Sequence, residues 1–135
     1  MECTPIGTVH TPFETTSEAP RQGFRDAAEG ILDVDPAYRE GLTGFDGDRI
    51  VVLWWADQAD REVLTLDRDP ARGVFTSRSP ARPNPICVTE CEVLSVDPST
   101  GRLRLRGVDM ADGSPVLDLK VPVDVQCWAD DSDST

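Results

Sequence analysis

The sequence contains a single lysine, Lys120, and a single histidine, His10. Its other basic residues are all arginines, and acidic residues outnumber basic ones by 25 to 13, which gives a formal net charge of −12. A lysine-poor acidic surface is typical of proteins that work in molar salt, where charge repulsion is screened and carboxylates hold water. We therefore expect a halophilic source; the alternative is an ordinary acidic protein.

Long apolar runs and aromatic residues are also scarce. Aromatics make up 6% of the chain, and no apolar run is long enough to span a bilayer. The start, Met1-Glu2-Cys3, lacks the basic and apolar regions of a signal peptide. We expect a cytoplasmic protein without a membrane partner. The length predicts one domain, residues 1–128, followed by a frayed acidic tail, residues 129–135.

The few sulfur and imidazole groups argue against a metal site. Two of the four cysteines, Cys87 and Cys91, have three residues between them, and the single histidine lies far away in the sequence. Zinc sites use closer pairs that are repeated or completed by histidines. We therefore expect no metal, and we interpret the cysteines as small buried apolar residues.

Short alternating segments dominate the rest of the chain. Strands are expected at residues 3–10, 30–34, 49–56, 62–66, 88–96, 102–108 and 116–125. One short helix is expected to start at Asp35-Pro36 and to end at Gly41. This mainly β pattern predicts a sandwich or a barrel. No Gly-rich strand-to-helix turn is present, so the usual dinucleotide-binding fold is not supported.

The segment most suited to chemistry covers residues 73–86. Its prolines, Pro80, Pro83 and Pro85, restrict the backbone around Arg78 and Arg82. Rigidly held guanidinium groups bind carboxylates or phosphates with two hydrogen bonds. From the residues alone, a stiff loop with solvated arginines explains the segment equally well. Two further arginines, Arg68 and Arg72, make this a local basic stretch in an acidic chain.

The same segment, Gly73-Val74-Phe75-Thr76-Ser77-Arg78-Ser79-Pro80-Ala81-Arg82-Pro83-Asn84-Pro85-Ile86, resembles the hallmark of the TrmO/TsaA-like (YaeB) family. Other motifs of this sequence also resemble the family, and they occur in the family's order. These are Pro5-Ile6-Gly7-Thr8-Val9 with Thr11-Pro12-Phe13, Pro20-Arg21-Gln22, Tyr38 with Gly41-Leu42, and the run from Val108 to Lys120. The resemblance covers residues 5 to about 123.

The resemblance implies a dimeric β-barrel of six to eight strands that binds S-adenosylmethionine near the subunit interface. It implies methylation of N6 of N6-threonylcarbamoyladenosine, the modified base next to the anticodon of tRNA. The cofactor contacts of the family fall on Pro20, Arg21, Gln22, Arg78, Val88, Asp109, Met110, Ala111 and Asp112.

The expected reaction needs several kinds of group. A carboxylate such as Asp109 or Asp112 would stabilise the positive charge on sulfur, although both also suit a tight turn. Asp57, after the central strand, is the candidate general base, against the alternative of a surface aspartate. Arg82 or Arg78 would bind the carboxylate of the threonyl group.

The chain also departs from the family pattern. Arg49 and Asp57 stand where other residues are usual, and Cys87 replaces the glycine after Asn-Pro-Ile. These changes leave two alternatives open. One is a non-catalytic barrel that binds S-adenosylmethionine or a nucleotide, and the other is a methyltransferase for another small substrate.

Overall fold

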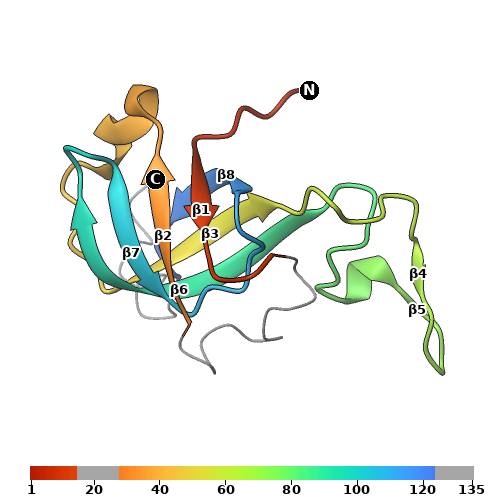
Figure 1. The fold of residues 1–135 in the computed structure, drawn as a ribbon. Coiled ribbons are helices and arrows are strands. Elements are labelled where there is room, and N and C mark those ends of the chain that lie inside the picture. The colour runs from red at the N-terminus through yellow and green to blue at the C-terminus, as the bar shows by residue number, and fades with distance from the viewer. Residues whose placement is uncertain (15–27, 124–135) are drawn as a thin grey trace, which may run out of the picture.

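Six antiparallel strands close into a barrel in the computed structural model, which describes residues 1–14 and 28–123 (Figure 1). The hydrogen-bonded order is β1-β2-β7-β6-β3-β8, and β8 returns to β1 where Gly7 pairs with Val116. The predicted mainly β barrel is therefore confirmed. The strand bounds are Gly7–His10 (β1), Glu29–Val34 (β2), Arg49–Trp55 (β3), Ile86–Asp97 (β6), Arg102–Arg106 (β7) and Ser114–Lys120 (β8).

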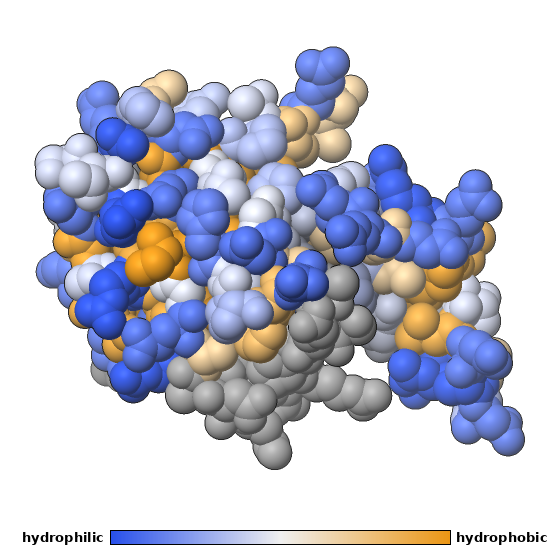
Figure 2. Space-filling model, in the orientation of Figure 1, coloured by the Kyte–Doolittle hydropathy of each residue, from blue (hydrophilic) through white to orange (hydrophobic). Residues whose placement is uncertain are grey.

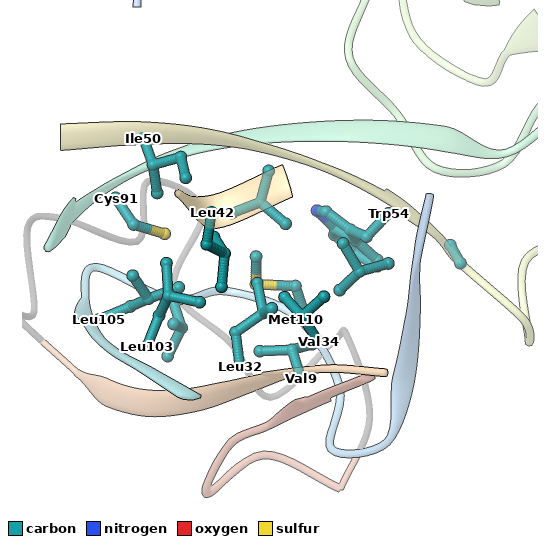
Figure 3. Packing of buried hydrophobic residues seen from close by; sticks show 14 residues of the cluster. Val9, Leu32, Val34, Leu42, Ile50, Trp54, Cys91, Leu103, Leu105 and Met110 are labelled. Carbon is teal, nitrogen blue, oxygen red and sulfur yellow. The ribbon is translucent and has the colours of Figure 1, made fainter. Parts of the chain in front are cut away.

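The alternating sequence of each strand places one set of side chains inside the barrel. In β7, Leu103 and Leu105 are fully buried, whereas Arg102 and Arg104 are exposed on the outer face. Figure 3 shows the inward side chains converging from all sides of the barrel, with Met110 among them. Burial of these apolar groups is the main stabilising term of such a domain.

Strand β3, expected at residues 49–56, is apolar on both faces. Ile50, Val52 and Trp54 point into the core, and the residues between them are half-buried on the outside. Trp54 is 3% exposed, whereas Trp55 lies outward beneath the guanidinium of Arg61, whose carbon is 5.2 Å from the ring centroid. The two adjacent tryptophans therefore lie on opposite faces of β3.

The expected short helix is present as a 3-10 helix, η2 (Pro36–Leu42), with Asp35 at its N-cap and Leu42 buried. Two strand predictions need correction. The strand predicted at 62–66 shrinks to β4 (Thr65–Leu66), which pairs with β5 (Arg72–Gly73), a strand absent from the predicted ones. These residues lie outside the barrel, so few neighbours are available to extend the pairing. The last strand ends at Lys120, where pairing with β3 stops.

Residues 56–85 form an arm that leaves the barrel between β3 and β6 and carries β4, β5 and a second 3-10 helix, η3 (Val74–Thr76). It projects to the right in Figure 1. Its base is held by the Trp55–Ile86 pair and by a 3.0 Å hydrogen bond from the Ala56 amide to the Pro85 carbonyl. None of the helices in the described residues is long and apolar enough to cross a membrane.

Candidate functional site

The candidate site lies beside the first half of β6, which has a strand partner on one side only. Residues 86–92 of β6 pair with β3, but the pairing of β6 with β7 begins only at Glu92. Beyond that point the connection from β7 to β8 runs beside β6 and contacts it through side chains. Cys91 Sγ lies 3.7 Å from the Gly107 carbonyl oxygen, and Thr89 contacts Asp109. Non-strand backbone therefore borders β6 here.

Asp109 is held at this border by a buried network. The hydroxyl of Thr89 donates a 2.6 Å hydrogen bond to Asp109 Oδ1, and the indole Nε1–H of Trp54 donates a 3.0 Å bond to Thr89 Oγ1. Thr89 is 7% exposed and belongs to the inner face of β6, where its neighbours Cys87 and Cys91 also lie. A carboxylate is thus fixed at the edge of an otherwise apolar core.

The proline-rich segment supplies Arg78 to the same border. Its Nη2 donates a 2.8 Å hydrogen bond to the carbonyl of Val88 in β6. Desolvation raises the pKa of Asp109, and the positive charge of Arg78 partly opposes this shift. Three predicted cofactor contacts, Arg78, Val88 and Asp109, are therefore brought together by elements that are distant in the sequence.

Arg82 points instead into its own segment. Its guanidinium donates hydrogen bonds to the carbonyls of Val74, the first residue of η3, and of Ser77, which follows its last residue. Arg61 reinforces the return of the chain to the barrel by donating to the Pro83 carbonyl at 2.7 Å and to Asn84 at 3.3 Å. Arg82 thus holds the shape of the arm, and its direct contact with an acceptor stays a prediction.

The rest of the Asp109–Asp112 run is fixed to the chain that follows β1. Thr11 donates its hydroxyl to the Met110 carbonyl at 2.7 Å and its amide to Asp112 Oδ1 at 3.0 Å. The Asp112 amide donates to the Phe13 carbonyl at 2.6 Å. The Met110 side chain is fully buried in the core, so a ligand would meet its backbone, whereas Asp112 is exposed and lies 3.6 Å from His10. The carbonyl of Ala111 accepts a 2.6 Å bond from Ser114.

Two sets of predicted residues are not part of this arrangement. Pro20, Arg21 and Gln22 lie outside the described residues. Asp57 is exposed at the start of the arm, and within residues 1–14 and 28–123 no hydrogen bond or ion pair connects it to Asp109 or Arg78. Its role as a general base stays a prediction.

Burial controls the ionisation of this site. Desolvation raises the pKa of Asp109 above its usual value near 3.8, against the opposing effects of the Thr89 hydrogen bond and the charge of Arg78. Desolvation also raises the pKa of Cys87 to about 11 and that of Cys91 to about 12, with Asp109 adding to both shifts. Both thiols are therefore neutral at pH 7, and Asp109 is the acidic group at the border.

Sequence reasoning missed Thr89 and the role of Trp54. The available signal was the alternation of β6, which places Thr89 on the inner face with Cys87 and Cys91, where a polar residue needs a partner. Cys91 is buried as expected, but Cys3 is exposed, because it precedes β1 and has no core to enter. The described residues contain no cluster of His, Cys, Asp or Glu suited to a metal ion.

Comparison with known proteins gives consistent matches. Residues 8–125 match the family described as the tRNA-methyltransferase O N-terminal domain. A probable S-adenosyl-L-methionine-binding protein from Halobacterium salinarum is 57% identical over 92% of this chain and 100% of its own length. An S-adenosyl-L-methionine-binding protein from Archaeoglobus fulgidus is 46% identical over 86% of this chain and 85% of its own length.

Solved structures agree with these sequence matches. A crystal structure of TrmO superposes with a TM-score of 0.78 at 31% identity, and that of TrmO from Pseudomonas aeruginosa with 0.77 at 31% identity. Both alignments cover 100% of this chain, which spans only 62% and 60% of the length of those two proteins.

Proposed function

The chain belongs to the family of the tRNA-methyltransferase O N-terminal domain, and on this premise we propose that it binds S-adenosylmethionine and methylates tRNA. The proposed acceptor is N6 of N6-threonylcarbamoyladenosine beside the anticodon, and the proposed place of action is the cytoplasm. The observation that carries the proposal is the meeting of Arg78, Val88 and Asp109 at one border of the barrel.

The residues at this border fit S-adenosylmethionine, which is cationic at sulfur. Asp109 is partly buried, and the ion pairs of the described residues do not include it. A cationic ligand would offset the desolvation of this carboxylate. Ile86 and Val88 are each about two-fifths exposed and offer apolar surface for an adenine ring. The names of the Halobacterium and Archaeoglobus relatives state the same ligand.

The protein groups would act mainly by positioning. When bound, the cofactor supplies an electrophilic methyl group. Arg78 connects the arm to β6 through the Val88 carbonyl, and Asp109 would place a negative charge beside the ligand. The hydrogen bonds of the Asp109–Asp112 run hold its backbone in place next to the ligand. Holding the acceptor nitrogen in line with the methyl group accounts for most of the expected rate gain. Asp57 is the proposed acceptor of the N6 proton, and Arg82 the proposed partner of the threonyl carboxylate.

Nucleoside mass analysis of tRNA tests the reaction. Cells that lack the gene should lose N6-methylated threonylcarbamoyladenosine, and the wild-type gene should restore it. Asp109→Asn should fail to restore it, whereas Asp118→Asn, which removes an exposed carboxylate of β8 that is paired with Lys120, serves as the matched control. Unchanged tRNA in the deletion strain would reject this substrate.

A binding-only barrel is the second candidate function. It is favoured by the isolation of Asp57 from the Asp109 border and by the binding-only names of the two relatives. Calorimetry in high salt separates the candidates when it is combined with the tRNA measurement. Cofactor binding without any change in tRNA supports the second candidate, and no heat at millimolar cofactor would reject both.

We also propose that a second copy of the chain covers the outer face of β3 and β6. Half-buried Leu53 and Trp55 adjoin the exposed Val88 and Ile86 across this strand pair, and Leu64 and Phe75 of the arm are 61% and 78% exposed. Figure 2 shows hydrophobic surface on the arm between hydrophilic residues. Apolar surface of this kind marks interfaces.

Light scattering in molar salt should give about twice the 14.8 kDa chain mass. Leu53→Glu should shift the protein to the monomer, because the new charge would be desolvated at the interface. Val51→Thr, on the same face, is the conservative control. A wild-type monomer at micromolar concentration would contradict the proposal.

A further inference from the structure

The network behind Asp109 has a fixed hydrogen-bond direction. The indole N–H of Trp54 can only donate, so Thr89 Oγ1 accepts at this contact. The single hydroxyl proton of Thr89 is then free for Asp109 Oδ1, 2.6 Å away. Since Trp54 is 3% exposed and Thr89 is 7% exposed, neither side chain has room to exchange this arrangement for one with water. The network therefore presents Asp109 in one orientation, as an acceptor.

Within residues 1–14 and 28–123, no cation forms an ion pair with the Asp109 carboxylate. Arg78 is the cation that acts on it, but its Nη2 bonds to the Val88 carbonyl. Cys87 and Cys91 face it from β6 as neutral thiols, and Arg82, which acts on Cys87, donates to carbonyls of the arm. Glu90 raises the pKa of Cys91 less than desolvation does, and it is paired with Arg49. Desolvation has the largest effect on the pKa of Asp109.

Asp112 offers a contrast within the same connection. Its Oδ1 accepts the Thr11 amide at 3.0 Å and lies 3.6 Å from His10 Nδ1, and its side chain is half exposed. Water and these partners already satisfy its charge. Of the two aspartates in the run, Asp109 is the one that gains most from a cation brought by a ligand.

We propose that Trp54 and Thr89 are positioning residues that hold Asp109 against the sulfonium of bound S-adenosylmethionine, so that the site prefers this cation to its neutral thioether product. The inference rests on the proposed function and deepens it. Methyl transfer removes the positive charge from sulfur, so Asp109 would lose its partner at that moment. Weaker binding of the product would then favour its release.

Calorimetry with three ligands tests the charge preference. S-adenosylmethionine carries the sulfonium, sinefungin carries an ammonium in its place, and S-adenosylhomocysteine is neutral there. Wild type should bind both cationic ligands more tightly than the thioether. In Asp109→Asn this preference should fall about tenfold, which corresponds to about 1.4 kcal/mol, with a small change for the thioether. Glu90→Gln, which removes an exposed charge from the same strand, should keep the preference.

Variants of Thr89 test the positioning role. Thr89→Val keeps the shape but removes the hydroxyl, so the preference for cations should fall several-fold, and Thr89→Ser should restore it. Carbon NMR of Asp109 without ligand gives an independent measurement. Loss of a hydrogen bond to the charged form should raise the pKa of Asp109 in Thr89→Val but not in Thr89→Ser.

The outcomes separate this inference from the proposed function. If wild type binds none of the three ligands, the proposed function fails and the inference fails with it. If Asp109→Asn weakens all three ligands equally, cofactor binding stands and the charge-reading role of Asp109 is wrong. An unchanged ligand preference and an unchanged Asp109 pKa in Thr89→Val would overturn the positioning role.

Discussion

The negative charge of Asp109 destabilises the fold and is proposed to strengthen cofactor binding. Its folded-state pKa is raised, chiefly by desolvation, so the folded protein holds this proton more tightly than the unfolded chain does. The contribution of this group to stability is therefore greatest in acid and is lost as the pH rises through the folded-state pKa. At pH 7 the charged side chain destabilises the fold relative to a neutral one.

Asp109→Asn should consequently melt at a higher temperature than wild type at pH 7 in the absence of ligand. The difference should shrink as the pH falls through the Asp109 pKa, because wild type then becomes neutral as well. Thermal melts over a pH series measure this, and Asp118→Asn controls for the loss of any surface charge. A lower melting temperature for Asp109→Asn at pH 7 would mean that the carboxylate stabilises the fold.

Arg82 acts on the arm through backbone carbonyls rather than through an ion pair. Replacement by Lys keeps the charge but loses the planar fork that reaches Val74 and Ser77 together. We expect the amides of Ser77, Ser79 and Ala81 to exchange with solvent at least about tenfold faster, for a loss of about 1.4 kcal/mol in local opening. Hydrogen exchange measures the effect, and Arg68→Lys in the exposed part of the arm is the control. Unchanged exchange would return Arg82 to the role of an acceptor-binding group.

At the scale of elements, the turn between β6 and β7 depends on Gly101. This residue has a φ of +73°, and a Cβ there would lie 2.5 Å from both the Val34 carbonyl oxygen and Arg39 Nε. The Gly101 carbonyl also accepts the Val34 amide at 2.7 Å, so the turn supports β2 from the side. Backbone conformation and close approach both require glycine.

Gly101→Ala should lower the free energy of unfolding by more than about 2 kcal/mol, since strain in the left-handed region alone costs about 1–2 kcal/mol. Gly44→Ala isolates that strain, because Gly44 has a φ of +80° with no atom within 4 Å of an added Cβ. Denaturant titration of both variants measures the difference. Equal losses would show that the contacts with Val34 and Arg39 adjust without cost.

The elements show where sequence patterns were sufficient and where they were not. The strand segments expected at 49–56 and 102–108 lie close to the observed bounds of β3 and β7. The contact between Thr89 and Asp109 spans 20 positions, and no local pattern encodes it. The same holds for the point at which β7 leaves β6, because strand pairing depends on distant partners. The fold was therefore more predictable than the geometry of the site.

At the scale of the whole molecule, the excess negative charge lies outside the arm. Residues 56–85 contain five arginines and five acidic residues, so the net charge of −12 belongs to the remaining chain. Cross-strand ion pairs such as Asp33–Arg102 and Glu92–Arg106 neutralise only some of the acidic side chains. These exposed pairs are weak, so the repulsion among the unpaired acids dominates the response to salt.

Thermal stability should therefore rise as KCl is increased toward molar concentration. Screening weakens the repulsion among the acids more than it weakens the few exposed pairs. Melting curves across a KCl series measure this, with sucrose as an uncharged control. A melting temperature that stays constant or falls with added KCl would contradict the halophilic interpretation.

The closed base of the arm has a consequence for how this molecule can change over generations. Because Trp55 pairs with Ile86 and Ala56 bonds to Pro85, the chain leaves and rejoins the barrel at one place. Lengthening such an excursion adds little entropy cost, only about 0.6 kcal/mol per doubling of a flexible loop. Insertions and deletions in the arm can therefore accumulate without disturbing barrel closure. The arm can change in length and sequence while the barrel keeps the contacts that stabilise the fold.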